Sequence, residues 1–357
     1  MNIAYKVGGS EYIRRLIKDA ISDGSRTATV VGNYIIDEAI RLPSDFTLIL
    51  DGCHLRLADG CYSNIFVNEH HDTELGRTVE GADRNITLLG RSSATLDGGE
   101  YNGLSERNQL TDERPPIWKN NLLLFTNVDG FHISGIRCVS QRWWALNFIY
   151  CRNGYIGDMY FLASDVGVDE NGERYHGLIR ERYDEVLIKN ADGVDIRQGC
   201  NNITIENISG FTEDDTIAIT GLNGALERAF AVRGLPPDIS HIKVKGVAAS
   251  AFCTIVRLLN QGGVPLHDIE IDGVRDTSGE NSYFDLGLYA VRVGDVRLYG
   301  ERHATADETY NISIRNVYAR NTYAVSLAGD MKGITMEGIE CADGCKMLLD
   351  ERISQTK

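Results

Sequence analysis

Three aspartates in the middle of the chain have a spacing that suggests chemistry. Asp192 lies in the segment Asn190-Ala-Asp-Gly, and Asp214 and Asp215 follow it by 22 and 23 residues. If one winding of the chain takes about 22 residues, the three aspartates lie side by side on adjacent windings and their carboxylates crowd one surface. Crowding of like charges raises at least one carboxyl pKa, so such a cluster can hold a proton near neutral pH. An arrangement of this kind is typical of general acid–base catalysis or of a cation site.

The segments around these aspartates share a template that repeats along the chain. Each copy has a turn residue, alternating apolar residues, then Asn, Gly or Asp, as in Asn202-Ile-Thr-Ile-Glu-Asn-Ile208. The second apolar positions of the copies are 88, 133, 156, 205, 244, 271, 314 and 336, mostly near one or two multiples of the low twenties apart. Short strands at that period indicate the coils of a solenoid. We predict an all-β, single-stranded right-handed parallel β-helix, with a β-sandwich as the alternative.

The solenoid is expected to form one domain over residues 1–357. Residues 10–24 have apolar side chains at helical spacing, with Ser10 as a candidate cap and Gly24 as a candidate stop. We expect this helix to cover the open end of the first coil. No other segment has a convincing helical pattern, so the coils extend over about 28–345 and leave a tail at 346–357.

Composition limits the partners of the chain. The 36 basic and 51 acidic residues give a net charge of −15, which disfavours nucleic acid. We find neither a signal peptide nor a membrane span, so we expect a cytoplasmic protein. The eight cysteines form no metal-binding set, and we predict buried reduced thiols with no metal and no cofactor. The oligomeric state is not specified. Four N-x-S/T sequons fall at template turns, where we interpret the asparagines as turn residues: Asn85, Asn202, Asn207 and Asn311.

Several motifs resemble glycoside hydrolase family 28, the polygalacturonase family. That family has an Asn-Thr-Asp-Gly segment followed about one coil later by Asp-Asp, here represented by residues 190–193 and 213–219. The resemblance extends to Asp97-Gly-Gly, to Arg114-Pro and to Trp144-Ala-Leu. The family's His-Gly is missing after the aspartate pair, and its Arg-Ile-Lys is reduced to Arg292-Val-Gly or to an early Arg257.

The resemblance implies a glycosidase that works by inversion. One carboxylic acid protonates the leaving oxygen and another carboxylate activates water, with the two groups ~6.5–9.5 Å apart. Asp214 is then the general acid, while Asp192 and Asp215 orient the water. Repulsion by these two ionised neighbours is expected to raise the pKa of Asp214. We interpret the nearby Asp195 as a turn cap.

Substrate-binding residues are less well marked by the sequence. Residues 164–182 have no strand pattern and are expected to be a loop beside the site. The adjacent Trp143 and Trp144 are expected to point one into the core and one outward. We expect a short oligosaccharide related to pectin, containing uronate or rhamnose. The candidate binding residues are Asn190, Arg197, Arg257, Arg292, His176 and Tyr283.

Two other classes stay open. A polysaccharide lyase or epimerase, or an enzyme of glycosyl transfer, could use the same solenoid, and a lyase could bind calcium through the aspartates. A non-catalytic carbohydrate-binding solenoid, such as a piece of a phage tail, is the third possibility. The crowded carboxylates argue against that last class because sugar binding alone does not require them.

Overall fold

The repeated apolar positions stack directly on one another. The computed structural model describes residues 3–99, 119, 121–141, 143–163, 166–168, 174–176, 191–261, 263–280, 287–296 and 302–353. In it, all eight template positions lie in one continuous ladder that runs from Leu88 through Ile133 and on to Met336. Spacings of 39 to 49 residues therefore each correspond to one coil with a longer connection, and not to two coils.

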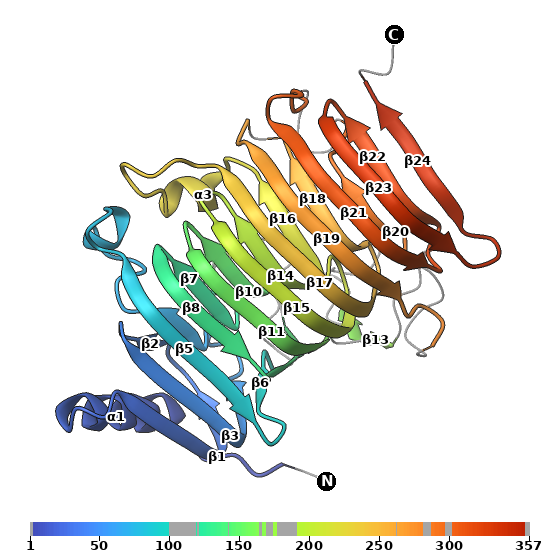
Figure 1. Ribbon diagram of the computed structural model, residues 1–357. Helices are drawn as coiled ribbons and strands as arrows, with labels where there is room; N and C mark the ends of the chain where they lie inside the picture. Colours follow the sequence, from blue (N-terminus) through green and yellow to red (C-terminus); the bar gives the residue numbers. More distant parts are fainter. Residues whose placement is uncertain are drawn as a thin grey trace.

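The chain is a right-handed parallel β-helix, as predicted, built from two long sheets (Figure 1). Sheet A contains β1 (Thr27–Ile36), β3 (Phe46–Leu57), β5 (Asp83–Arg91), β6 (Thr95–Asp97), β8 (Val128–Ser134), β9 (Arg137–Val139), β11 (Arg152–Leu162), β15 (Asn201–Thr212), β17 (Ile239–Ala251), β19 (Leu266–Asp276), β21 (Thr309–Ala319) and β23 (Lys332–Cys341). Sheet B contains β2 (Ile40–Leu42), β4 (Phe66–Asn68), β7 (Leu123–Thr126), β10 (Trp144–Ile149), β14 (Asp192–Arg197), β16 (Ile217–Gly221), β18 (Thr254–Asn260), β20 (Tyr289–Val293), β22 (Tyr323–Gly329) and β24 (Lys346–Arg352). All pairings within both sheets are parallel, so adjacent coils lie ~4.8 Å apart.

Asparagines at the corners of the coils hold neighbouring turns together. The side-chain amide of Asn202 donates a hydrogen bond of 2.7 Å to Asn153 Oδ1 on the preceding coil. Asn85 and Asn311 make the equivalent bond to aspartates, at 2.7 and 3.2 Å. All four sequon asparagines have φ between +51° and +55°, a left-handed conformation that asparagine tolerates well. All four lie within strands β5, β15 and β21, so they bend these strands at the corners of the coils and do not belong to separate turns.

The two ends of the solenoid differ. Helix α1 (Gly9–Ser22) packs against β1 and β2 and covers the first coil, as expected (Figure 1). Ser10 is not its cap: the side chain is buried and its hydroxyl bonds to the backbone of Glu38 on the coil below. Residues 346–352 are not a tail, because they form β24 and pair with β22. The last coil is largely exposed, with 56% of Met347 accessible.

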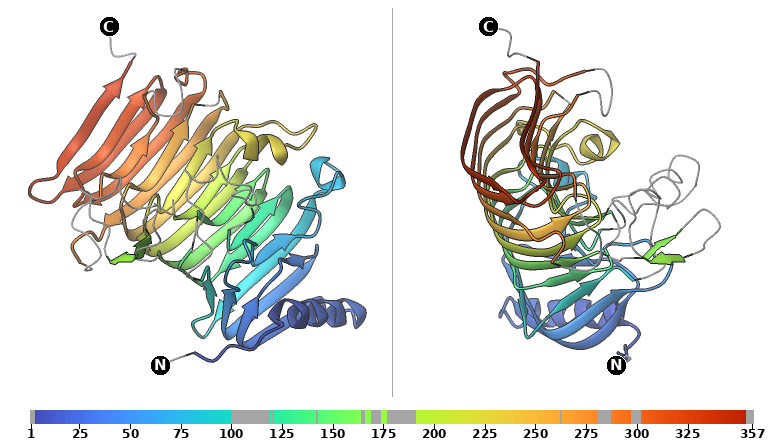
Figure 2. Two further views of the ribbon diagram at one scale, coloured as in Figure 1. Left: turned by 180° about the vertical axis from the view of Figure 1, so that it is seen from behind. Right: turned by 90° about the vertical axis from the view of Figure 1, so that its right-hand side faces the viewer.

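Some elements lie outside the coils. A short 3-10 helix, η1 (Leu75–Arg77), precedes β5, and a second α-helix, α3 (Ala225–Ala229), follows β16. Sequence analysis did not expect α3. Strands β12 (Val166–Val168) and β13 (Arg174–His176) form an antiparallel pair, so the segment expected to be a loop contains two short strands (Figure 2). Within the described part of the chain, no helix has the length and apolar character needed to cross a membrane.

Candidate active site

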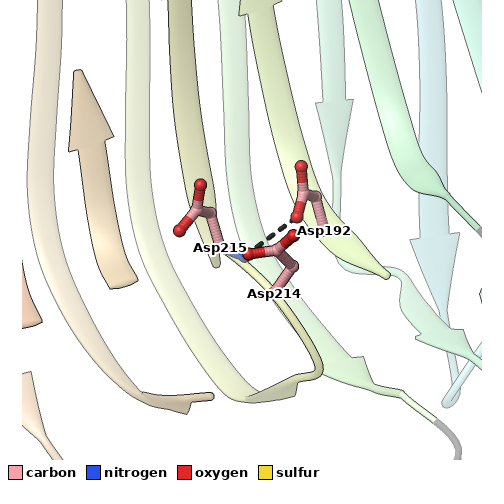
Figure 3. Close-up of side chains that lie close together, drawn as sticks. All are labelled: Asp192, Asp214 and Asp215. Atoms are coloured by element: carbon pink, nitrogen blue, oxygen red, sulfur yellow. Dashed lines mark hydrogen bonds between the residues drawn. The ribbon is translucent and has the colours of Figure 1, made fainter. Parts of the chain in front are cut away.

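The three aspartates meet where two strands of sheet B begin. Asp192 is the first residue of β14, and Asp214 and Asp215 lie in the turn before β16 (Figure 3). The backbone N–H of Asp215 donates a hydrogen bond of 2.9 Å to Asp192 Oδ1, and the N–H of Gly193 donates one of 3.0 Å back to the Asp215 carbonyl. Two adjacent coils thus lock together at this point, as the 23-residue spacing predicts.

The carboxylates of this trio are close and poorly hydrated. One oxygen from each of the three lies within 4.8 Å of the others. Only 5% of Asp192 and 8% of Asp215 is exposed, while Asp214 is more accessible. A protein interior or cleft of this kind destabilises the charged form of a carboxyl group. Three ionised carboxylates at this distance are strongly disfavoured, so the trio retains protons at a pH where isolated aspartates are ionised.

Burial, rather than repulsion, is the main cause of the altered acidity. It raises the pKa of Asp214 to about 6 and that of Asp215 to about 7. The pKa of Asp192 is raised well above its usual range, first by burial and then by the charges of Asp195, Asp214 and Asp215. Nearby Arg257 lowers the pKa of both Asp214 and Asp215, which opposes part of the effect. We expected repulsion by Asp192 and Asp215 to raise the pKa of Asp214. The pKa is raised, but burial is the main cause, so the expected cause is wrong.

Asp195 has a different place from the one expected. It lies within β14, not at a turn, and it is fully buried on the outer side of the sheet. Burial raises its pKa to about 7, although Arg197 opposes this shift. Among the charges that raise the pKa of Asp192, that of Asp195 has the largest effect. The acidic group therefore extends beyond the trio along the strand.

Arg197, expected to bind substrate, is engaged by protein groups. Its guanidinium donates hydrogen bonds to Asp195 at 2.9 Å, to Glu227 at 3.0 Å and to Asn147 at 3.1 Å. It also lies 3.7 Å from the centroid of the Trp144 ring, and only 4% of the residue is exposed. Two carboxylates therefore surround one cation. These contacts connect β14 to α3 through Arg197, and they occupy the guanidinium that was expected to bind a sugar.

The other two arginines lie together on the C-terminal side of the trio. Arg257 and Arg292 are paired in register on β18 and β20 and share Asp295, each with a contact of 2.8 Å. The Arg292 guanidinium is 4.8 Å from the centroid of the Tyr289 ring. The charge of Arg257 also acts on Asp214 and Asp215, so this arginine links Asp295 with the trio. The structure therefore places both residues on the sheet that carries the trio.

The remaining candidates cannot be placed at the site. Asn190 and Tyr283 lie outside the described residues. His176 ends strand β13, where its backbone pairs with Val166, and its side chain is not described. These three candidates stay predictions.

The two tryptophans also differ from expectation. Neither belongs to the main core: Trp143 and Trp144 are both buried in a second apolar cluster on the outer side of sheet B. The polar residues Asn147 and Glu227 were missed as well. Asn147 could have been found from the register, because it is paired with Asp195 in the outward row of positions. Glu227 lies in a long connection, where no periodic signal exists.

The trio has the donor set of a hard cation, since carboxylate oxygens are preferred ligands of Ca²⁺. Among the described residues, Asp192, Asp214 and Asp215 form the one group of acidic, histidine or cysteine side chains that lie close enough together to hold an ion. The raised pKa values mean that a cation would compete with protons for the same oxygens. The geometry alone is therefore compatible with acid–base chemistry and with cation binding.

Comparison with known proteins shows the fold. No protein-family model matches the sequence, and none of the curated proteins matches it. A mutant tailspike protein of E. coli bacteriophage HK620, in complex with a pentasaccharide, superposes with a TM-score of 0.59 at 13% identity, covering 99% of this chain and 63% of the tailspike. An exopolygalacturonase from Thermotoga maritima superposes with a TM-score of 0.52 at 14% identity, covering 96% and 88%. The chain thus spans less than two thirds of the tailspike. At this identity the comparison shows the fold alone, and the parallel β-helix is the architecture that this chain shares with them.

Proposed function

We propose that this chain is a glycosidase that cleaves its substrate by acid–base catalysis at Asp192, Asp214 and Asp215. The observation that carries the proposal is the convergence of three poorly hydrated carboxyl groups whose pKa values are raised toward neutrality. Such a cluster contains a proton donor and a proton acceptor at the same pH, which is what hydrolysis of a glycosidic bond requires. The family resemblance of the motifs and the similarity of the fold to an exopolygalacturonase support the same class.

In the proposed reaction, Asp214 donates its proton to the glycosidic oxygen as the bond from that oxygen to the anomeric carbon breaks. Water attacks the anomeric carbon and loses one proton to an ionised carboxylate of the Asp192–Asp215 pair. The leaving sugar departs as an alcohol and the attacked sugar gains a hydroxyl, so atoms and charges balance. Asp214 is proposed as the donor because it is the most accessible of the three. Its pKa of about 6 is below that of Asp215, about 7, so the three groups share their protons, and the mechanism requires the proton to lie on Asp214 when substrate is bound. Asp192 and Asp215, joined through a backbone hydrogen bond, suit the joint orientation of water.

The stereochemical course is open to a direct test. The 4.8 Å limit describes the closest single oxygens of the trio, whereas retaining (~5–5.5 Å) and inverting (~6.5–9.5 Å) enzymes are distinguished by the separation of two whole carboxyl groups. The motif resemblance implies inversion. The configuration of the first-formed product, followed by proton NMR, decides between them. Retention would assign Asp192 or Asp215 as a nucleophile in place of a water-orienting pair.

We propose an oligosaccharide related to pectin as the substrate, with uronate or rhamnose units. Arg257 and Arg292 support an acidic sugar, since both cations lie on successive coils of the sheet that carries the trio. The test is hydrolysis of oligogalacturonates and of rhamnogalacturonan fragments by the wild type and by Asp214→Asn. We expect new reducing ends with the wild type and none with the variant.

Two outcomes would replace the proposal. An ultraviolet-absorbing unsaturated product that disappears on chelation would identify a lyase that uses the trio as a cation site. Binding of the same oligosaccharides with equal affinity by the wild type and Asp214→Asn, without any cleavage, would identify a carbohydrate-binding protein.

A further inference from the structure

The eight cysteines do not share one environment. Four of them are buried in the main apolar core, as the sequence predicts for all eight: Cys53, Cys138, Cys151 and Cys200. The other four are partly exposed, so the prediction of buried thiols is wrong for them: Cys61, Cys253, Cys341 and Cys345. Two of the exposed thiols, Cys341 and Cys345, are only four positions apart in the sequence. Both lie in the last coil that the structure describes (Figure 1).

A β-turn brings Cys341 and Cys345 together. Cys341 is the last residue of β23, and Cys345 directly precedes β24. The N–H of Cys345 donates a hydrogen bond of 3.1 Å to the Ala342 carbonyl, which closes the turn. Gly344, at the third position of the turn, has a φ of +86°, a conformation that glycine adopts without strain. The chain therefore reverses between the two cysteines.

Both side chains face the interior of the coil. Cys341 pairs in register with Ala319, a fully buried residue of the coil before it. Cys341 and Cys345 both pack against the main apolar core. Cys341 is also the neighbouring side chain that most affects the pKa of Cys345, which indicates that the two thiols lie side by side. Two sulfur atoms on facing side chains are what a disulfide requires.

This coil is the least well covered part of the core. Strands β23 and β24 each pair with one neighbouring strand, β21 and β22. Met336 occupies an inward ladder position, yet 40% of it is exposed, whereas Ile314 at the same position of the preceding coil is fully buried. A region with few buried apolar contacts is expected to open more readily than the rest of the fold. A covalent link between its two strands opposes that opening.

We propose that Cys341 and Cys345 form a disulfide that links β23 to β24 across this turn. The turn is then a site of covalent modification, and the reagent is a small oxidised thiol such as oxidised glutathione. The proposal does not depend on glycosidase activity, because β24 lies four strands beyond β16 in sheet B. The other partly exposed thiols, Cys61 and Cys253, lie in earlier coils.

The link forms by two thiol–disulfide exchanges. The Cys341 thiolate attacks one sulfur of oxidised glutathione, which releases a first glutathione and leaves a second one bound to Cys341. Cys345 then loses its proton and attacks the Cys341 sulfur, which releases the bound glutathione. Two protein thiols are oxidised to one disulfide, and one oxidised glutathione is reduced to two thiols. The two thiol protons end on the two glutathione molecules, so atoms and electrons balance.

The order of the two exchanges follows from the surroundings of Cys345. Burial raises the pKa of Cys345 to about 12, so this thiol is not the first to react. Part of the rise comes from Cys341 itself and disappears once Cys341 carries glutathione. Burial against the core remains, so the second exchange is slow and must be followed over hours.

The first experiment locates the disulfide. The reduced full chain is incubated with oxidised glutathione, its remaining thiols are alkylated, and it is cut before aspartates with endoproteinase Asp-N. Cleavage before Asp343 separates the two cysteines, so we expect peptides 330–342 and 343–349 to stay joined until they are reduced. Glutathione that stays on Cys341, or thiols of Cys341 and Cys345 that remain free, would overturn the proposal.

The core offers a matched control within the same molecule. The N–H of Cys151 donates a hydrogen bond of 3.4 Å to the Cys200 sulfur, but both residues are fully buried. We expect this pair to stay reduced, because oxidised glutathione does not reach it. A disulfide between Cys151 and Cys200 without one between Cys341 and Cys345 would overturn the argument from exposure.

Hydrogen exchange tests the effect on the coil. We expect the backbone N–H groups of β24 to exchange at least ~10-fold more slowly in the oxidised protein than in the reduced one. Cys345→Ser should stop at one glutathione on Cys341 and should not show this protection, whereas Cys61→Ser should behave like the wild type. Equal exchange in the oxidised and reduced wild type would show that the link does not hold β23 to β24.

Discussion

Replacing Asp215 with asparagine should stabilise the fold at alkaline pH. Burial raises the pKa of Asp215 to about 7, whereas an aspartate in the unfolded chain ionises near 3.8. Between these values the folded state binds a proton that the unfolded state has lost, so the free energy of unfolding falls as pH rises from about 4 to about 7. Three pKa units correspond to ~4 kcal/mol, an upper limit because the trio shares its protons.

Asparagine removes that penalty because it cannot ionise. Part of the gain is lost because a neutral amide no longer attracts the nearby Arg257, whose charge favours the ionised carboxyl group. We therefore expect Asp215→Asn to be ~2–3 kcal/mol more stable than the wild type at pH 8 and no more stable at pH 4. Hydrolytic activity should be lost at the same time, as is common when a strained functional group is removed.

Urea unfolding followed by circular dichroism at both pH values measures this effect. Asp307→Asn is the control: its side chain is 86% exposed, and neutralising it should change stability by less than ~0.5 kcal/mol at either pH. A variant at Asp215 that is as stable as the wild type, or less stable, at pH 8 would refute the reasoning. It would mean that Asp215 is ionised in the native protein without cost and that the trio stores no proton.

Four further outcomes are expected. Asp214→Asn should abolish hydrolysis while its circular dichroism spectrum stays that of the wild type. Arg197→Met should lower the free energy of unfolding by ~3 kcal/mol in urea, because it leaves buried carboxylates uncompensated, whereas Arg233→Ala should change it by under ~1 kcal/mol. Gly210→Ala should cost ~3 kcal/mol by the same measurement, since φ there is +114° and a Cβ would lie 1.9 Å from the Phe161 carbonyl oxygen. Hydrolysis should persist in EDTA, and its loss would indicate that the trio works with a bound cation.

The fold could be predicted from the periodic spacing of apolar residues, because every coil must meet the same physical requirement. Each winding must place an apolar side chain on the one below, so the eight ladder positions could be found without a structure. The same register brought Asp192 and Asp215 together. The predicted tail was wrong over 346–352, which form β24, because the last coil has no successor to bury it. Its apolar residues therefore do not show the usual alternation. The cytoplasmic location stays a prediction.

The role of Arg197 could not be predicted, because its partners come from three different parts of the chain. Asp195 is a near neighbour in sequence, but Asn147 lies 50 residues before Arg197 and Glu227 lies 30 residues after it. Asn147 can be recognised as a partner only from the register of β10 against β14, which pairs it with Asp195. Glu227 sits in a connection whose length varies from coil to coil and which obeys no period.

The coils and the connections therefore contribute differently to this protein. The repeated coils fix the spacing of the trio, and hence the perturbed pKa values on which the proposed chemistry depends. The connection at 222–235 holds Arg197 through Glu227 and contains none of the proposed catalytic groups. For this reason the Arg197–Glu227 pair and the aspartates should separate in experiment, the first changing the free energy of unfolding and the second changing turnover.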